Sequence, residues 1–252
     1  MLCLLPMCLF SQQTDTLPFK NMITVQYDYF HFDKQFTNDW HIAGIEYKHE
    51  AKNAALLGRF NYANRLAQNG WQTELEAYPK FSKKVYSYAG IGYSPDMPVF
   101  PKFRAGYSLY VNLPKAIELE GGFRYLYFDK SLLIGVACIG FYTGNWFLQA
   151  RSFLSDNNGF NFAGIATARR YFGEMNDYAW LQIGTGVSPD ESRNIQFTTN
   201  QRLYSNRVTI GIRKSIQRKH LLIFHTGYSR DEYQPKTFGN QYFGSVGYAR
   251  RF

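Results

Sequence analysis

The sequence predicts an all-β protein, a transmembrane antiparallel β-barrel of about fourteen strands, with twelve strands as the alternative. Apolar and polar residues alternate along most of the chain from about residue 22 onward, as in strands with one face on lipid and one on a lumen. The longest apolar run, from Leu132 to Tyr142, has 11 residues, fewer than the roughly 18–20 that a membrane helix needs. The chain also ends in an alternating strand whose last residue is the aromatic Phe252.

The composition fits a barrel. Hydrophobic residues make up 45% of the chain, which excludes a disordered protein. Aromatic residues reach 18%, and 21 glycines accompany them; aromatic side chains suit a pleated sheet, and glycine suits its turns and bends. The mean hydropathy of −0.35 remains compatible with a membrane location, because only every second residue of a barrel strand faces lipid.

The alternation is clear in two consecutive segments, 103–111 and 117–127, where an apolar face opposes a face of charged or small residues. Connections are short, and no linker divides the chain, so we expect one domain. The fourteen expected strands cover residues 22–32, 39–49, 54–65, 70–79, 85–95, 101–111, 116–128, 131–142, 144–154, 160–172, 178–188, 201–216, 220–230 and 241–252.

Residues 1–11 are predicted to be a signal peptide, and residues 12–252 the barrel domain. The first ten residues are largely apolar and precede a small residue, Ser11. No Lys or Arg stands before the apolar run, so the true start could lie upstream of Met1. A buried N-terminal element is the alternative. Loss of the signal would leave Cys138 as the lone cysteine, so no intrachain disulfide is expected.

An even number of strands sets the sidedness. With a periplasmic N-terminus, the basic turns 50–53, 80–84, 112–115 and 217–219 become periplasmic. The formal net charge of +9 is then spread over turns and not gathered on one strand face, so nucleic acid is not an expected partner. The external loops are expected to carry acidic residues: Asp33, Asp39, Asp96, Asp129, Asp156, Asp190, Glu191, Asp231 and Glu232.

Two short repeats, Tyr93-Ser-Pro-Asp96 and Val187-Ser-Pro-Asp190, are expected to end strands on the external side, because proline lacks an N–H for the ladder and aspartate favours turns. A paired binding motif is the alternative. The four tryptophans, Trp40, Trp71, Trp146 and Trp180, are expected to lie in the interfacial aromatic girdles.

Charged residues at inward positions form the candidate site. Paired with one another, they would stiffen a polar interior; left available, their arginines would bind carboxylates and phosphates along a path for anionic solutes or a polyanionic glycan. The lumen candidates are Arg59, Arg65, Glu74, Glu76, Arg104, Glu118, Glu120, Arg124, Arg151, Arg169 and Arg213. No cofactor and no metal ion is expected.

An enzyme is the least favoured interpretation. His31 and His41 flank the first expected external loop near Asp33 and Asp39, where a His–Asp pair could act as a base or bind a cation. The sequence lacks a Gly-x-Ser-x-Gly elbow and a His-Glu-x-x-His motif. A catalytic role is therefore not expected.

The order and spacing of several motifs resemble one known family, the YaiO family of outer-membrane β-barrels. The resemblance runs from about residue 40 to the end, and it implies an outer-membrane barrel with no established reaction. The motifs are Arg59-Phe-Asn-Tyr-Ala-Asn-Arg65, Asn69-Gly-Trp-Gln72, Glu76-Ala-Tyr-Pro79, Tyr86-Ser-Tyr-Ala-Gly-Ile-Gly-Tyr-Ser94, Phe100-Pro101 with Arg104, Glu118 with Gly122-Phe-Arg-Tyr-Leu-Tyr-Phe128, Gly144-Asn-Trp146, Arg169-Arg-Tyr-Phe172 and Gly184-Thr-Gly-Val-Ser-Pro-Asp-Glu191.

The sequence thus predicts a monomeric barrel in the cell outer membrane. Its expected role is that of a passive pore, or of an export or assembly component, for an anionic glycan or solute. A closed structural or adhesive surface barrel is the first alternative, and a lipid-modifying enzyme the second. Expected partners are outer-membrane lipid, lipopolysaccharide and, through Phe252, the barrel-assembly machinery.

Overall fold

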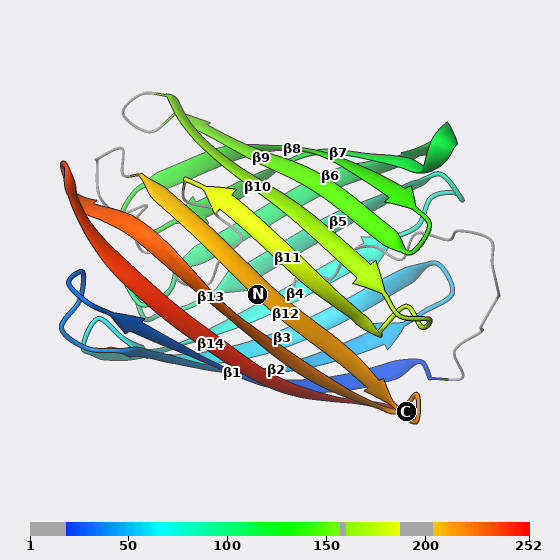
Figure 1. Ribbon diagram of the computed structural model, residues 1–252, viewed down its shortest axis with the longest axis horizontal. Coiled ribbons are helices and arrows are strands. Elements are labelled where there is room, and N and C mark those ends of the chain that lie inside the picture. Colours follow the sequence, from blue (N-terminus) through cyan, green and yellow to red (C-terminus); the bar gives the residue numbers. More distant parts are fainter. Residues whose placement is uncertain (1–18, 157–159, 187–203) are drawn as a thin grey trace.

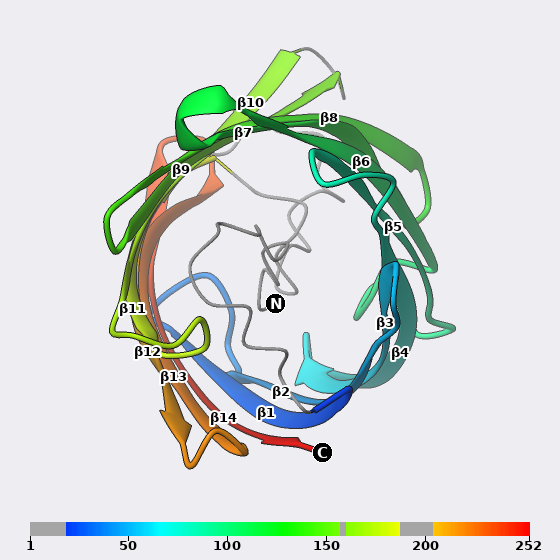
Figure 2. The same cartoon turned by 90° about the vertical axis from the view of Figure 1, so that its right-hand side faces the viewer.

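A computed structural model describes residues 19–156, 160–186 and 204–252. Fourteen antiparallel strands form one closed barrel, in which each strand pairs with its sequence neighbours and β1 pairs with β14 (Figures 1 and 2). The prediction of fourteen strands is confirmed, and the alternative of twelve is wrong. The strands are β1 (Asn21–Phe32), β2 (Trp40–Glu50), β3 (Ala54–Arg65), β4 (Gln68–Pro79), β5 (Val85–Tyr93), β6 (Phe103–Leu113), β7 (Ile117–Tyr127), β8 (Ser131–Thr143), β9 (Trp146–Asp156), β10 (Phe160–Tyr171), β11 (Tyr178–Thr185), β12 (Ser205–Ile216), β13 (His220–Gln234) and β14 (Thr237–Arg251).

The outer surface of the wall is apolar, and much of the inner surface is polar. In β7, Leu119 and Phe123 are exposed, whereas Glu118 and Glu120 are buried. A period of two puts alternate residues on opposite faces of a sheet, so the sequence pattern becomes an apolar belt around a lumen. The single helical turn in the described residues, Pro114–Ala116, is too short to cross a membrane, and those residues contain no helix long and apolar enough to do so.

Two of the four tryptophans lie where the girdle prediction puts them. Trp71 and Trp146 are exposed on the outer face. Trp40 is 2% exposed and packs inside the barrel, and Trp180 has the inward parity of the buried Tyr178 on β11. The girdle prediction is therefore wrong for Trp40 and Trp180, because strand parity, and not residue type, decides which face a side chain joins.

The two ends of the barrel differ in their connections. We call the end formed by the turns 51–53, 80–84, 114–116 and 217–219, together with Asn21 and Phe252, the C-terminal rim, and the other end the opposite rim. At the C-terminal rim the backbone of Phe252 exchanges two hydrogen bonds of 2.9 Å with Asn21, which closes the first strand onto the last.

The β13–β14 hairpin extends further than the sequence predicts. Pairing continues to Gln234↔Thr237 past an irregularity after Glu232. Asp231 and Glu232 therefore lie in β13, 5% and 6% exposed, and not in an external loop; the prediction for these two residues is wrong. Hydrogen bonds hold both carboxylates, from the Ser205 hydroxyl to Asp231 and from the Tyr204 backbone N–H to Glu232. The predicted signal 1–11, the repeat 187–190 and Glu191 lie outside the described residues.

Residues 94–102, between β5 and β6, form a segment that we call the strap. It begins as the turn predicted at Pro95, since β5 ends at Tyr93. The strap docks on the inner side of β4: the Asp96 carboxylate accepts a hydrogen bond of 2.9 Å from the Trp71 backbone N–H. A Cβ at Gly70 would lie only 2.8 Å from side-chain atoms of Asp96 and Val99, so this close approach requires glycine.

The strap contacts two separate parts of the barrel wall near the opposite rim. Val99 and Phe100 are buried in an apolar cluster contributed by β1, β2, β3 and β14, which comprises Phe30, Phe32, Trp40, Ile42, Ala63 and Phe243. Met97 packs against a second cluster, from β7 to β10, which includes Leu126, Leu132, Ile134, Val136, Phe153 and Ala163. The strap therefore links two walls of the lumen through side chains that exclude water.

Candidate functional site

All eleven lumen candidates lie on the inner face of the barrel, buried or half-buried. Glu74, Glu118 and Glu120 are at most 5% exposed, and Arg65 is 1% exposed. The candidates comprise seven arginines and four glutamates, an excess of three positive charges.

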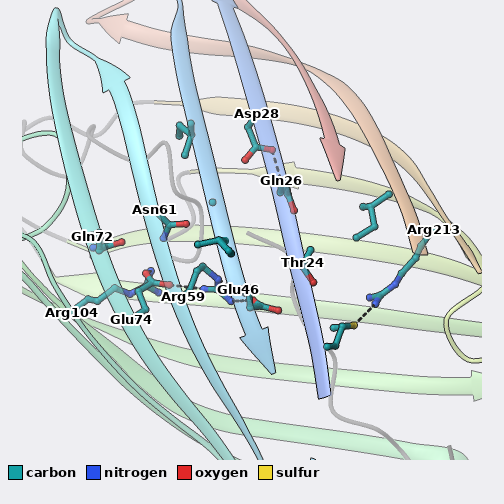
Figure 3. A pocket seen from close by; sticks show the side chains of 15 residues that line it. Thr24, Gln26, Asp28, Glu46, Arg59, Asn61, Gln72, Glu74, Arg104 and Arg213 are labelled. Atoms are coloured by element: carbon teal, nitrogen blue, oxygen red, sulfur yellow. Dashed lines mark hydrogen bonds and ion pairs between the residues drawn. The ribbon is translucent and has the colours of Figure 1, made fainter. Parts of the chain in front are cut away.

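The first group of charges is centred on Arg59 of β3. Its Nη2 lies 2.6 Å from Glu46 Oε2, and its Nη1 lies 2.5 Å from Glu74 Oε2 (Figure 3). The same Nη1 lies 3.5 Å from Glu76 Oε1. Arg104 reaches Glu74 from β6, with 2.5 Å between Nη1 and Oε1. Five neighbouring inward side chains are thus tied into one network by charge-assisted hydrogen bonds.

The second group is centred on Glu120 of β7. Its Oε2 accepts a hydrogen bond of 2.6 Å from Arg151 Nη2, and its Oε1 accepts one of 2.8 Å from the Tyr110 hydroxyl. Arg124 Nη2 lies 3.6 Å from Glu120 Oε1, and its guanidinium lies over the Tyr88 ring. Glu118 accepts a hydrogen bond of 2.7 Å from the Tyr86 hydroxyl.

Together, these two groups place paired charges on the inner wall from β2 to β9. Buried ionic groups are tolerated where they are paired and hydrogen-bonded. Glu46, Glu74, Glu76 and Glu120 meet that condition through arginines. The carboxylates consequently act as fixed counter-charges that position the arginine side chains. Three further candidate arginines, Arg65, Arg169 and Arg213, lie outside the two groups.

Those remaining arginines rest on aromatic rings or on sulfur. The Arg65 guanidinium carbon lies 5.7 Å from the Trp40 ring centroid and 4.8 Å from that of Phe100 in the strap. Arg169 lies 4.2 Å from the Tyr178 ring centroid, and Arg213 contacts the Met22 thioether at 3.7 Å. Such cation–π contacts attract a guanidinium to the face of the ring.

A cavity lies inside the barrel between the first group and Arg213. It contains about 720 Å³ of empty space, part of it open solvent. Its lining has three acidic residues, three arginines and a set of amides and hydroxyls (Figure 3). These polar residues are Asp28, Glu46, Glu74, Arg59, Arg104, Arg213, Thr24, Gln26, Asn61 and Gln72. The cavity is therefore suited to a hydrated polar solute.

Sequence reasoning missed several interior charges. Glu46 and Asp28 both line the cavity, and their signal was available, since Glu46 shares the inward parity of Trp40 and Ile42 on β2. Arg251 is a further interior charge: it is 5% exposed and lies on the face of β14 opposite to Phe252.

The candidate histidines lie on the outer face of the barrel. His31 Nδ1 is 2.9 Å from Asp39 Oδ1, and Tyr29 also donates a hydrogen bond to Asp39. The hydrogen bond from Tyr29 has the larger effect, and together with that of His31 it holds the pKa of the Asp39 carboxyl below its usual range. His41 Nδ1 lies 2.6 Å from the Tyr27 hydroxyl. The expected His–Asp pair is thus present.

That outer cluster lacks the other parts of a hydrolase or of a metal centre. No serine or cysteine in the described residues forms a hydrogen bond with the ring of His31 or His41. Over the same residues, no group of three His, Cys, Asp or Glu side chains could hold a metal ion. Asp33 bonds Asn240 instead of a histidine.

A closed fourteen-stranded wall with an apolar exterior and a polar interior defines the class: a β-barrel protein of the outer membrane. Residues 20–191 match the family described as the YaiO membrane beta barrel domain. The chain belongs to this family. No curated protein matches its sequence.

Three solved structures show the same fold at low sequence identity. "CymD monoaromatic hydrocarbon channel" has a TM-score of 0.61 at 8% identity, covering 93% of this chain and 89% of its own. Omp33 of Acinetobacter baumannii has a TM-score of 0.54 at 11% identity, with 93% and 98% covered. "Bacterial polysaccharide outer membrane secretin" has a TM-score of 0.54 at 7% identity, and the match covers 92% of this chain and 98% of its own. These likenesses bear on the fold alone.

Proposed function

We propose that the barrel is a narrow passive pore for anionic solutes, including acidic glycan fragments. The observation that carries this proposal is the set of arginines on the inner wall: seven are among the lumen candidates, and they pair with glutamates or rest on aromatic rings and sulfur. A lumen that is lined by fixed positive charge and walled by low-dielectric material raises the local concentration of anions. The paired carboxylates hold the guanidinium groups in place along the path.

Arginine suits such a path better than lysine does. Its fork binds carboxylate and phosphate groups through two parallel hydrogen bonds. Arg104 and Arg124 lie on adjacent strands, β6 and β7, and pair with Glu74 and Glu120. An anion that passes through the lumen binds one guanidinium group after another. Because each contact is weak, the anion can both enter and leave the pore.

Planar-bilayer recording tests the pore. The purified barrel is expected to conduct ions with a preference for anions, and Arg104→Ala and Arg124→Ala are each expected to lower that preference, because each change removes one inward positive charge. Arg170→Ala is the control, since Arg170 is exposed on the outer wall, over the Trp146 ring. Absence of any conductance would overturn the proposal, as would a selectivity that neither lumen variant alters.

A closed structural or adhesive barrel is the second candidate. The strap favours it, because its two apolar contacts narrow the lumen near the opposite rim. In either case we propose that lipopolysaccharide surrounds the wall, and that the assembly machinery recognises the last strand through Phe252. Conductance separates the two candidates.

A catalytic role is not proposed. Replacing His31 and His41 together by alanine is expected to leave the lipid A and phospholipid composition of the membrane unchanged, because in the described residues these rings contact Asp39 and tyrosine side chains. Mass spectrometry of extracted lipids measures this. A lipid species that disappears in the double variant and returns with the unchanged protein would establish an enzyme.

A further inference from the structure

Two arginines near the C-terminal rim differ from those of the paired groups. Arg213 of β12 and Arg251 of β14 are 3% and 5% exposed. Arg213 Nη2 lies 3.7 Å from the Met22 sulfur, and Arg251 Nη2 donates a hydrogen bond of 3.0 Å to Ser215 Oγ. Each guanidinium thus reaches across neighbouring strands along the inner wall.

The surface beneath them is apolar. Leu221 and Ile223 of β13 lie between the two arginine-bearing strands and are fully buried. Met22, Leu221 and Ala249 form an apolar cluster there. Removal of water by such a surface makes an unneutralised charge more costly and strengthens any contact with an opposite charge.

The described residues provide neither arginine with a carboxylate at ion-pair distance. Glu174 attracts Arg251, but its carboxylate is already 3.1 Å from the exposed Arg218, and Arg213 and Arg218 both repel Arg251. Within the part of the chain that the structure describes, three of their buried N–H groups have no acceptor: Nε of Arg213 and Nε and Nη1 of Arg251. Two buried like charges with unused donors have the composition of an anion site.

We propose that Arg213 and Arg251 bind an oxyanion, the phosphate or carboxylate group of a solute, at the end of the cavity nearest the C-terminal rim. Arg213 lines the cavity (Figure 3), so an anion in the cavity can reach it. Arg59 is unsuited to the same task because three carboxylates already surround it. The proposal deepens the proposed function and rests on it for the route by which the anion arrives.

Binding of inorganic phosphate to the full barrel in lipid nanodiscs tests the site without requiring conduction. Phosphate is titrated and followed by the broadening of its phosphorus NMR line. Arg213→Met and Arg251→Met are each expected to weaken binding at least about tenfold, the loss that a charged hydrogen bond represents. Arg213→Lys keeps the charge but loses the fork, and a smaller loss is expected.

Arg218→Met is the matched control, since Arg218 belongs to the same rim but is exposed and paired with Glu174; it is expected to bind phosphate as the unchanged protein does. The heat-dependent shift of gel mobility identifies folded barrels, and only folded variants are compared. A parallel titration with acetate shows which oxyanion is preferred. Tighter binding of phosphate indicates a phosphate-bearing solute, and tighter binding of acetate indicates a carboxylate-bearing one.

The outcomes separate this proposal from the preceding one. Saturable phosphate binding that is lost in both methionine variants establishes the site, even if the barrel conducts no ions and the pore proposal fails. Absence of binding of both phosphate and acetate, or equal binding by the unchanged protein and both methionine variants, overturns the site, whatever the conductance.

Discussion

Replacement of strap residues 95–101 by Asn-Gly is expected to raise the single-channel conductance several-fold. The strap carries Val99 and Phe100 into one apolar cluster and Met97 onto another, so it occupies lumen cross-section that ions would otherwise use. The shortened hairpin can close, because the Ser94 N–H already bonds the Lys102 carbonyl at 3.1 Å, and Asn-Gly suits a two-residue turn.

The measurement is the conductance of the shortened and unchanged barrels in the same planar bilayers. A Lys52→Gly change in the turn 51–53 of the C-terminal rim serves as the control, and it is expected to leave conductance unaltered. If the shortened barrel conducts no better than the unchanged one, the strap does not limit the passage, and the narrowing lies elsewhere.

Arg59→Met is expected to lower the free energy of unfolding by about 3–5 kcal/mol, the cost of leaving one partner of a buried ion pair uncompensated. Arg59 is the shared partner of Glu46, Glu74 and Glu76, so its loss brings three carboxylates together with only Arg104 to offset them. Methionine keeps much of the side-chain length, so the effect of lost packing is small.

Urea titration of the barrel folded in lipid vesicles measures this loss. Arg218→Met is the control, because the Arg218 side chain is 62% exposed in its pair with Glu174, and exposed pairs contribute less than about 1 kcal/mol. Equal stabilities of the two variants would show that the carboxylates around Arg59 relax or take up protons, and that the network does not stabilise the wall.

Much of the fold could be predicted from the sequence because the alternation of apolar and polar residues within each barrel strand shows which residues face lipid and which face the lumen. Alternation over β6 and β7 assigns each residue to lipid or lumen, and closure of the barrel leaves the parity unchanged. The same reasoning placed all eleven lumen candidates on the inner wall. The prediction for Trp40 and Trp180 is wrong because it rests on residue type, whereas their positions in the strand alternation point them into the lumen.

What could not be predicted depends on contacts between distant segments. The strap contains Pro95, Asp96 and Pro98, a turn-like composition that says nothing of its packing against β1 and β14. The extension of the β13–β14 hairpin depends on cross-strand pairing past Glu232. The pairing of Arg59 with Glu46 depends on the β2–β3 register, and that of Arg251 with Ser215 on how β12 and β14 both flank β13.

The reversal potential of the unchanged barrel in a potassium chloride gradient tests the central claim, that the lumen is a path for anions. With arginines along the inner wall, we expect a measurable current whose reversal potential is displaced toward the chloride equilibrium potential, less so at high salt as screening increases. A displacement toward the potassium potential would contradict it, as would a lack of current through both the unchanged barrel and the barrel with the shortened strap.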